Sequence, residues 1–272
     1  MFKTLLINLE NRPDRLIHTL KELRKVGLSK EVIRIEAVNS YTAEQLKCAY
    51  ISEKAFNNIN DITNTCILPN HSSLGCAISH INCWKYMLNN NIDECIIVED
   101  DIEIVNQELF TIDINNIKNI KNKIAYDDPS IFIVFNSHKL DSNIINYNSY
   151  SQYDYKFNSS NLNVIRVPIK GIFFYYINLN MAKYFLKYIQ QITYQMDIEI
   201  GLLSQNANEK TKFFNYNTCN LIQSNKFKSD IQTYLITSKD IRDILNIPDC
   251  IADIIFDYIP TIFKYNIKNF IN

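Results

Sequence analysis

Three consecutive carboxylates follow a short apolar stretch in the first half of the chain. Residues 95–98 are Cys-Ile-Ile-Val, which is typical of a buried strand, and Glu99, Asp100 and Asp101 come directly after them. Adjacent carboxylates repel one another unless a cation or a basic side chain lies beside them. Mg²⁺ and Mn²⁺ prefer oxygen ligands, and either ion can neutralise the charge on a diphosphate. The pattern therefore indicates a divalent-metal site or, as the alternative, a solvated acidic turn.

A second segment places two arginines close to the N-terminus. Residues 8–15 read Asn-Leu-Glu-Asn-Arg-Pro-Asp-Arg, at the point where a strand is expected to give way to a helix. Arg12 and Arg15 are suited to bind phosphate oxygens there, because a helix N-terminus also favours anions. The alternative is that they pair with Glu10 and Asp14 on the surface.

His80 is the third candidate. It shares one expected helical stripe with Cys76, Cys83 and Met87, where a histidine is more often part of the core than a catalyst. Its closeness in sequence to Glu99 is the reason to consider it for the site.

The elements that must position these groups alternate along the chain. Strands are expected at 3–8, 32–38 and 94–98, and helices from Pro13 to Gly27, at 42–56 and at 73–88. This order predicts an α/β fold with a largely parallel, helix-flanked sheet. Because ligands bind beyond the carboxyl ends of such strands, residues 8–15, Asn39 and the acids should share one rim.

The second half gives a weaker pattern. Residues 112–163 are rich in Asn, Ser and Tyr and indicate loops around one strand at 131–135. Strands at 164–167 and 172–177 and a helix at 181–192 follow.

Composition narrows the range of partners. The 272 residues include 28 Lys and Arg against 29 Asp and Glu, so the chain lacks the basic field that non-specific nucleic-acid binding needs.

Seven cysteines without a C-x-x-C pair indicate reduced thiols and no structural zinc. No signal peptide or membrane span is recognisable, so we expect a cytoplasmic protein. The apolar residues 244–270 leave peripheral membrane contact and homo-oligomerisation open.

Taken in order, four motifs resemble glycosyltransferase family 25, which includes bacterial lipopolysaccharide and lipooligosaccharide glycosyltransferases and the collagen galactosyltransferases. They are INLENRPDR at 7–15, AVNS at 37–40, GCAISH at 75–80 followed by Trp84, and IVEDD at 97–101. Weaker similarity continues through 171–183, Met196-Asp197, Gln223 and Ser229-Asp230-Ile231, so the resemblance spans about residues 2–232. Ser73 stands where the family usually has Glu, and Ile172 and Phe174 stand where smaller or polar residues are common.

The resemblance implies a GT-A-like nucleotide-sugar-binding fold and inverting transfer of a hexose. The donor would be UDP-galactose or UDP-glucose, used with Mn²⁺ or Mg²⁺, and the acceptor a hydroxyl on a glycan, a lipopolysaccharide-like molecule or a protein. Residues 1–235 would form the glycosyltransferase domain and 236–272 a helical tail of unassigned role.

On this basis each candidate residue receives a role. Asp101 is the expected principal metal ligand, and Glu99 and Asp100 would share coordination or hold donor hydroxyls. Asp197 is the expected general base, with Asp230 as the second choice. The remaining candidates would surround the donor: Asn8, Leu9, Arg12, Arg15 and Asn39 at the nucleotide, His80 behind the acids or along the donor pocket, and His138 as an extra metal ligand.

Three other functions fit the same residues. Ser73 leaves room for a non-catalytic nucleotide-sugar-binding relative. The acids also suit a metal-dependent nucleotidyltransferase, and the apolar C-terminal residues suit a structural interaction module.

Overall fold

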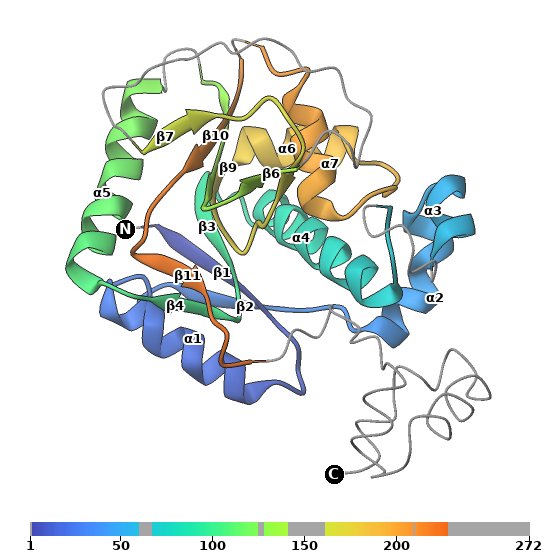
Figure 1. Ribbon diagram of the computed structural model, residues 1–272, viewed down its shortest axis with the longest axis horizontal. Coiled ribbons are helices and arrows are strands. Elements are labelled where there is room, and N and C mark those ends of the chain that lie inside the picture. The colour runs from blue at the N-terminus through green and yellow to red at the C-terminus, as the bar shows by residue number, and fades with distance from the viewer. Residues whose placement is uncertain (1, 60–66, 125–127, 141–160, 209, 228–272) are drawn as a thin grey trace, which may run out of the picture. The chain divides into compact units, whose positions relative to one another are not determined.

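A seven-stranded sheet forms the centre of the protein in the computed structural model, which describes residues 2–59, 67–124, 128–140, 161–208 and 210–227 (Figure 1). The described residues all belong to one unit, Met1–Phe227. The tail expected at 236–272 and the candidate base Asp230 lie outside the described residues. No helix among the described residues is long and apolar enough to cross a membrane.

The strand order is β2-β1-β3-β9-β5-β10-β7. Their bounds are β1 Lys3–Asn8, β2 Val32–Glu36, β3 Glu94–Glu99, β5 Ser130–Phe135, β7 Leu162–Val164, β9 Phe174–Asn178 and β10 Thr211–Tyr216. Strands β2, β1 and β3 pair in parallel, as do β5 and β10, while β9 runs antiparallel between β3 and β5, and β7 runs antiparallel to β10. The prediction of a largely parallel, helix-flanked α/β sheet is confirmed.

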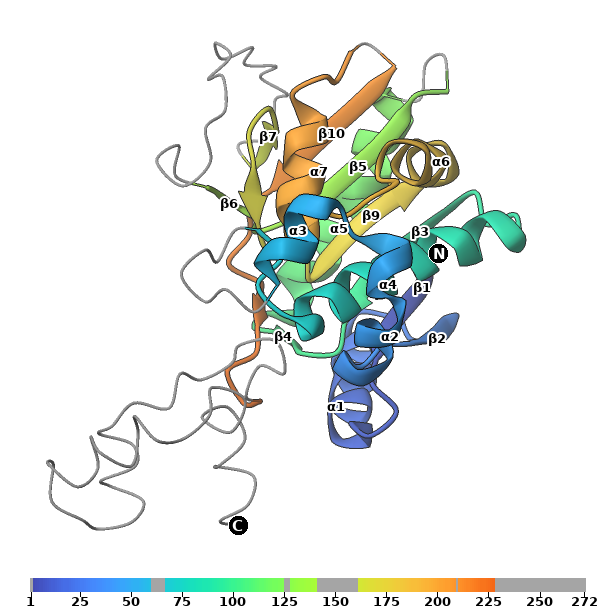
Figure 2. The ribbon, with the colours of Figure 1, turned by 90° about the vertical axis from the view of Figure 1, so that its right-hand side faces the viewer.

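Helices cover both faces of this sheet. On one face lie α1 (Pro13–Lys25) and α5 (Gln107–Ile124), and on the other α4 (His71–Asn89), α6 (Leu179–Tyr188) and α7 (Met196–Ser204). In Figure 2 the second group lies in front of the sheet. Successive residues of β3 show why the strand is apolar throughout: Cys95 and Ile97 pack into one core, and Ile96 and Val98 into the other.

Two small two-stranded sheets complete the fold around the carboxyl ends of the strands. β4 (Ile102–Ile104) pairs with β11 (Leu221–Gln223), and β6 (His138–Lys139) pairs with β8 (Ile169–Lys170). β11 therefore brings a late segment of the chain back to the turn that follows β3.

Two predicted elements were wrong, and the strand expected at 164–167 is β7, which ends at Val164. The helix expected at 42–56 is two helices, α2 (Ser40–Tyr50) and α3 (Glu53–Asn58), because Ser52 accepts a hydrogen bond from the Ala55 backbone N–H and caps the second. The loops expected from residue 112 give way to α5, whose apolar side chains recur at helical spacing between polar ones: Phe110, Ile114, Ile117, Ile120 and Ile124.

Helix α4 packs unusually close to the loop after β2. A Cβ atom at Gly75 would lie 2.2 Å from the carbonyl oxygen of Val38, a distance that no side chain tolerates. One turn later, Ser79 Oγ accepts a hydrogen bond from the Val38 backbone N–H at 2.9 Å and donates to the Gly75 carbonyl at 2.6 Å. The Gly and Ser of the GCAISH motif therefore fix the position of α4, and with it the direction of His80.

Replacing Gly75 tests this packing. Alanine in a helix interior normally adds up to about 1 kcal/mol of stability relative to glycine. We expect Gly75→Ala instead to lower the free energy of unfolding by about 1–3 kcal/mol, because the added methyl group forces α4 and the Val38 loop apart. Urea denaturation measures the difference. Asn82→Ala, at a half-buried position of the same helix, is the control; an equal or higher stability of Gly75→Ala would contradict the close approach.

Candidate active site

The acidic residues meet at the carboxyl edge of the sheet. Parallel pairing aligns Ile7 of β1 with Glu99 of β3, and β9, which runs the other way, begins at the same edge, where the Glu99 N–H donates to the Phe173 carbonyl at 2.8 Å. Glu99 ends β3, and Asp100 and Asp101 form the turn that follows, each only 7% exposed. Carboxylates so deeply buried need specific partners.

Asp100 has its partners within the protein. Its Oδ2 accepts from Asn8 Nδ2 at 2.7 Å, and its Oδ1 accepts from Arg15 at 2.9 Å. Asn8 is held in turn, since its Oδ1 accepts from Arg34 Nε at 3.0 Å. Burial raises the pKa of Asp100, and the bonds from Asn8 and Arg15 oppose that rise. Asp100 thus faces inward and anchors the turn.

Asp101 is in a different situation. Its Oδ2 accepts from Gln223 Nε2 at 3.0 Å, whereas its Oδ1 is buried without a hydrogen-bond partner among the described residues. Burial, reinforced by the charge of Glu99, raises the pKa of Asp101 from 3.8 to about 7. The guanidinium of Arg15 is 4.0 Å away and offsets this only in part. An unpartnered oxygen beside a second carboxylate is a suitable donor set for a hard divalent cation.

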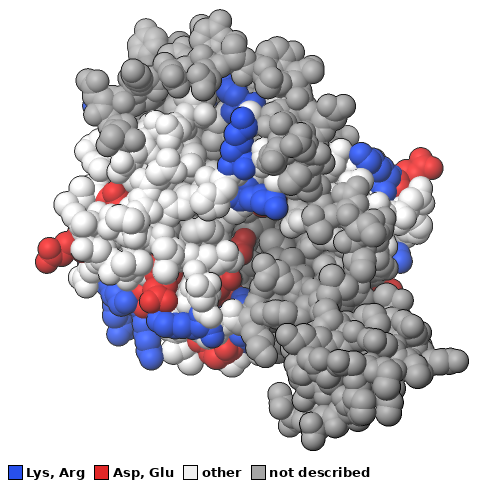
Figure 3. Space-filling model, in the orientation of Figure 1, with Lys and Arg blue, Asp and Glu red and all other residues white. Residues whose placement is uncertain are grey.

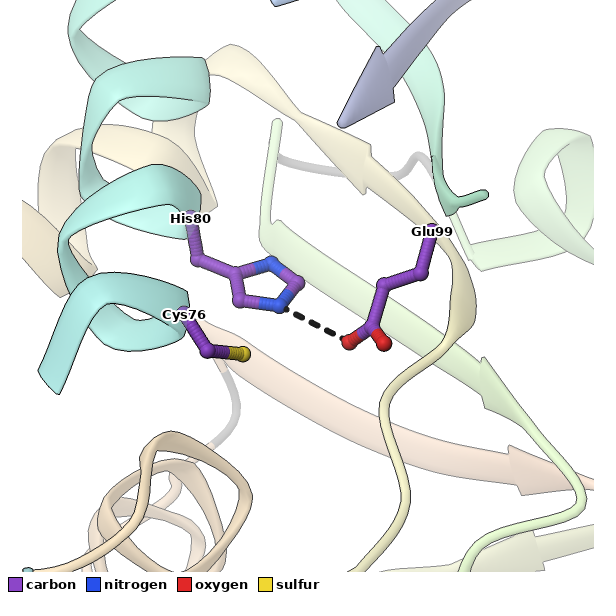
Figure 4. A group of neighbouring side chains, drawn as sticks. All are labelled: Cys76, His80 and Glu99. Atoms are coloured by element: carbon purple, nitrogen blue, oxygen red, sulfur yellow. Dashed lines mark hydrogen bonds and ion pairs between the residues drawn. The ribbon is translucent and has the colours of Figure 1, made fainter. Parts of the chain in front are cut away.

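Glu99 is oriented by a chain of buried side chains. Trp84 Nε1 donates to the Tyr175 hydroxyl oxygen at 3.1 Å, and that hydroxyl lies 3.0 Å from His80 Nδ1. Because the Glu99 carboxylate can only accept, the proton of the neutral ring is on Nε2, 3.2 Å from Oε1, to which it donates (Figure 4). Nδ1 then accepts from the Tyr175 hydroxyl, whose oxygen also accepts from Trp84. His80 therefore steadies the acid from behind.

Asp197 lies in the first turn of α7. Its two oxygens accept from the backbone N–H groups of Gly171 at 2.9 Å and Ile198 at 2.8 Å, which fixes the carboxylate. Burial raises the pKa of Asp197, and the charge of Glu99 adds to the rise, so the two acids interact. In Figure 3, acidic atoms lie inside a recess on this face, and basic side chains lie along its upper rim.

The structure separates other candidates from this group. Arg12 forms an ion pair with Asp14 at 3.2 Å, as the surface alternative predicted for it, whereas Arg15 turns inward to Asp100. Asn39 caps α2 by accepting from the Thr42 N–H at 2.9 Å. Leu9 is half-buried directly after β1. His138 is exposed on β6, where it pairs with Lys170 of β8.

The pattern of the sequence alone did not indicate two residues that support the site, Tyr175 and Gln223. Tyr175 reads in the sequence only as part of an apolar strand, yet it carries the hydrogen bonds that orient His80. Gln223 came to notice only through the family resemblance, and nothing in its neighbours indicates a bond to an acid 122 positions earlier. The pairing of β11 with β4 creates that contact, and the Ser224 N–H also donates to the Asp101 carbonyl.

With this geometry established, the comparison with known proteins is informative. A family model described as glycosyltransferase family 25 (LPS biosynthesis protein) matches residues 1–200 of the 272. The chain belongs to glycosyltransferase family 25. No curated protein matches it. Membership shows that the mixed, mostly parallel sheet is a GT-A-like glycosyltransferase fold and that the chain is a glycosyltransferase. Gln223 lies beyond the matched residues.

The raised pKa of Asp101 makes a prediction about the metal-free enzyme. With its pKa at about 7 in the folded chain and 3.8 as its ordinary value, Asp101 binds more protons folded than unfolded between these values. Its contribution to stability is therefore present at low pH and is lost as pH rises through that window. Asp101→Asn removes this loss, so in chelator the variant should exceed the wild type by up to about 4 kcal/mol at pH 8 and by little at pH 4.

Urea denaturation in EDTA at the two pH values measures this difference. Asp93→Asn is the matched control, because Asp93 is exposed just before the opposite end of β3. If the gain from Asp101→Asn were the same at both pH values, or absent, Asp101 would not carry a buried charge.

Proposed function

We propose that this glycosyltransferase is metal-dependent and inverting, and that it transfers galactose or glucose from a UDP-sugar to a hydroxyl acceptor. The observation that carries the proposal is the electrostatic coupling of Glu99 to both Asp101 and Asp197, with one Asp101 oxygen buried and without a hydrogen-bond partner among the described residues. Family membership supports glycosyl transfer. The three carboxylates offer the metal ligands and the general base that the proposed reaction needs.

Asp101 and Glu99 are the proposed metal ligands, and the residues present fit such an ion. Asp101 Oδ1 lacks a partner among the described residues, and Glu99 is held in place through His80. A hydrogen bond from a neighbouring side chain commonly orients a metal-binding carboxylate in this way. When bound, Mn²⁺ or Mg²⁺ would neutralise negative charge on the departing diphosphate.

The donor nucleotide is proposed to lie along the turn after β1. Arg12 is the arginine best placed for phosphate, because it is partly exposed at the start of α1, whereas Arg15 holds Asp100. Asn8 and Asn39 are already engaged, with Asp100 and Thr42 respectively, so we expect their contribution to be to the shape of this edge.

Asp197 is the proposed general base. Inversion requires the acceptor oxygen to lose its proton while it attacks the anomeric carbon, and the proton needs an acceptor at that point. The two backbone N–H bonds fix the Asp197 carboxylate, and burial makes it a stronger base than an ordinary aspartate. Such a base contributes about 10²–10⁴-fold in rate.

The proposed acceptor is a hydroxyl group on a glycan. The family's description names LPS biosynthesis, which supports a lipopolysaccharide-like glycan. A hydroxylated protein is the second acceptor class implied by the resemblance, and the expected cytoplasmic location stays a prediction.

The activity assay follows release of UDP from UDP-galactose or UDP-glucose in Mn²⁺. We expect slow donor hydrolysis without acceptor and faster release with a glycan acceptor. Asp101→Asn should abolish both, and Asp197→Asn should slow transfer by about 10²–10⁴-fold, because it cannot take the acceptor proton. Asp93→Asn is again the control and should turn over like the wild type.

Three other results would each contradict a different part of the proposal. Full activity in chelator would rule out metal dependence. A thermal shift with UDP and Mn²⁺ but no turnover would identify a non-catalytic binding relative, since ligand binding alone raises apparent stability. Pyrophosphate release from nucleoside triphosphates would identify a nucleotidyltransferase.

A further inference from the structure

Cys76 lies beside His80 and Glu99 and has no role in the proposed reaction. Its sulfur, a ring nitrogen of His80 and a carboxylate oxygen of Glu99 all lie within 4.8 Å of one another (Figure 4). Cys76 and His80 are four residues apart on α4, so both side chains project from one face of the helix toward the end of β3. Glu99 joins this pair only through folding, so the spacing of residues along the chain does not indicate the cluster.

The His80 ring is already held as a metal-binding histidine usually is. Its Nε2 faces Glu99, and its Nδ1 lies 3.0 Å from the hydroxyl of Tyr175, which is fully buried. Metal-bound histidines commonly have their second ring nitrogen hydrogen-bonded to a neighbouring group, which fixes the ring plane. Here that support is rigid, since Trp84 donates to the same hydroxyl.

We propose that Cys76, His80 and Glu99 form a second metal site, which takes zinc, and that zinc bound there inhibits the enzyme. Sulfur and imidazole donors favour Zn²⁺ over Mg²⁺ or Mn²⁺, which prefer oxygen. Three protein ligands are a common zinc set that leaves the fourth position open. The inhibition rests on the proposed function, because Glu99 would be drawn from the Asp101 site.

The geometry needs only a small adjustment. Zinc–ligand bonds of about 2.0–2.3 Å put tetrahedral ligand atoms roughly 3.3–3.8 Å apart. His80 Nε2 and Glu99 Oε1 are already 3.2 Å apart, and the half-buried Cys76 can move the remaining distance by side-chain rotation. On binding, the Cys76 thiol releases its proton to solvent. His80 would bind through Nε2, so its ring proton moves to Nδ1, which then donates to the Tyr175 oxygen as the hydroxyl rotates its own proton away from Nδ1.

Cobalt is the direct probe of this site, because Co²⁺ replaces Zn²⁺ and a Co²⁺–thiolate bond gives a near-ultraviolet charge-transfer band. We expect the band in the metal-free wild type titrated with Co²⁺ and in Asp101→Asn. We expect it to be lost in Cys76→Ser and in Cys76→Ala. Cys48→Ser is the control for other thiols, since Cys48 is exposed on α2. No band in the wild type, or a band that persists in both Cys76 variants, would overturn the zinc site.

A kinetic measurement then tests inhibition. The zinc concentration that halves donor turnover, taken relative to each variant's own zinc-free rate, should be at least about tenfold higher in Cys76→Ser, because the soft ligand is gone. An unchanged concentration would overturn the inhibitory role. The two proposals can fail independently. The cobalt band reports metal binding at Cys76 whether or not the protein transfers a sugar.

Discussion

The buried ion pair between Arg15 and Asp100 is the interaction on which the acidic site depends. Three adjacent carboxylates cannot all turn into the protein without a positive partner, and Arg15 supplies it from the first turn of α1 at 2.9 Å. Asn8 completes the set on the other oxygen. With the carboxylate of Asp100 satisfied inside the protein, Glu99 and Asp101 take their hydrogen bonds from other partners, His80 and Gln223. A buried pair of this kind adds little net stability, and its value lies in the conformation that it fixes.

Two supports then orient the remaining acids from different parts of the fold. Behind Glu99, His80 is fixed by the buried Tyr175 on β9 and by the close packing that Gly75 allows. At Asp101, β11 brings Gln223 to one carboxylate oxygen and leaves the other without a partner among the described residues. Sites held by packed helices and strands are more precise than sites held by loops alone. The residues around the acids are therefore as important to the site as the acids themselves.

The sequence predicted the part of this arrangement that local pattern determines. The apolar run of β3, the alternation of strands and helices, and the shared rim for residues after β1 and β3 follow from periodicity and from the geometry of parallel sheets. Local pattern could not tell Arg12 from Arg15, since both stand in one charged turn, and only packing of α1 sends Arg15 inward. Gln223 depends on a strand pairing more than a hundred residues away, for which periodicity holds no signal.

The placement of Asp101 links the stability of the enzyme to its ligands. In the metal-free protein the buried carboxylate is costly to ionise, which is why its pKa rises to about 7. A group that supplies positive charge to Oδ1 would remove that cost, and it would stabilise the folded state in proportion to how far its concentration exceeds its dissociation constant, on a logarithmic scale. Because Glu99 contributes to the raised pKa of Asp101, a cation that neutralises either acid also favours ionisation of the other. The two carboxylates are thus best described as one electrostatic unit.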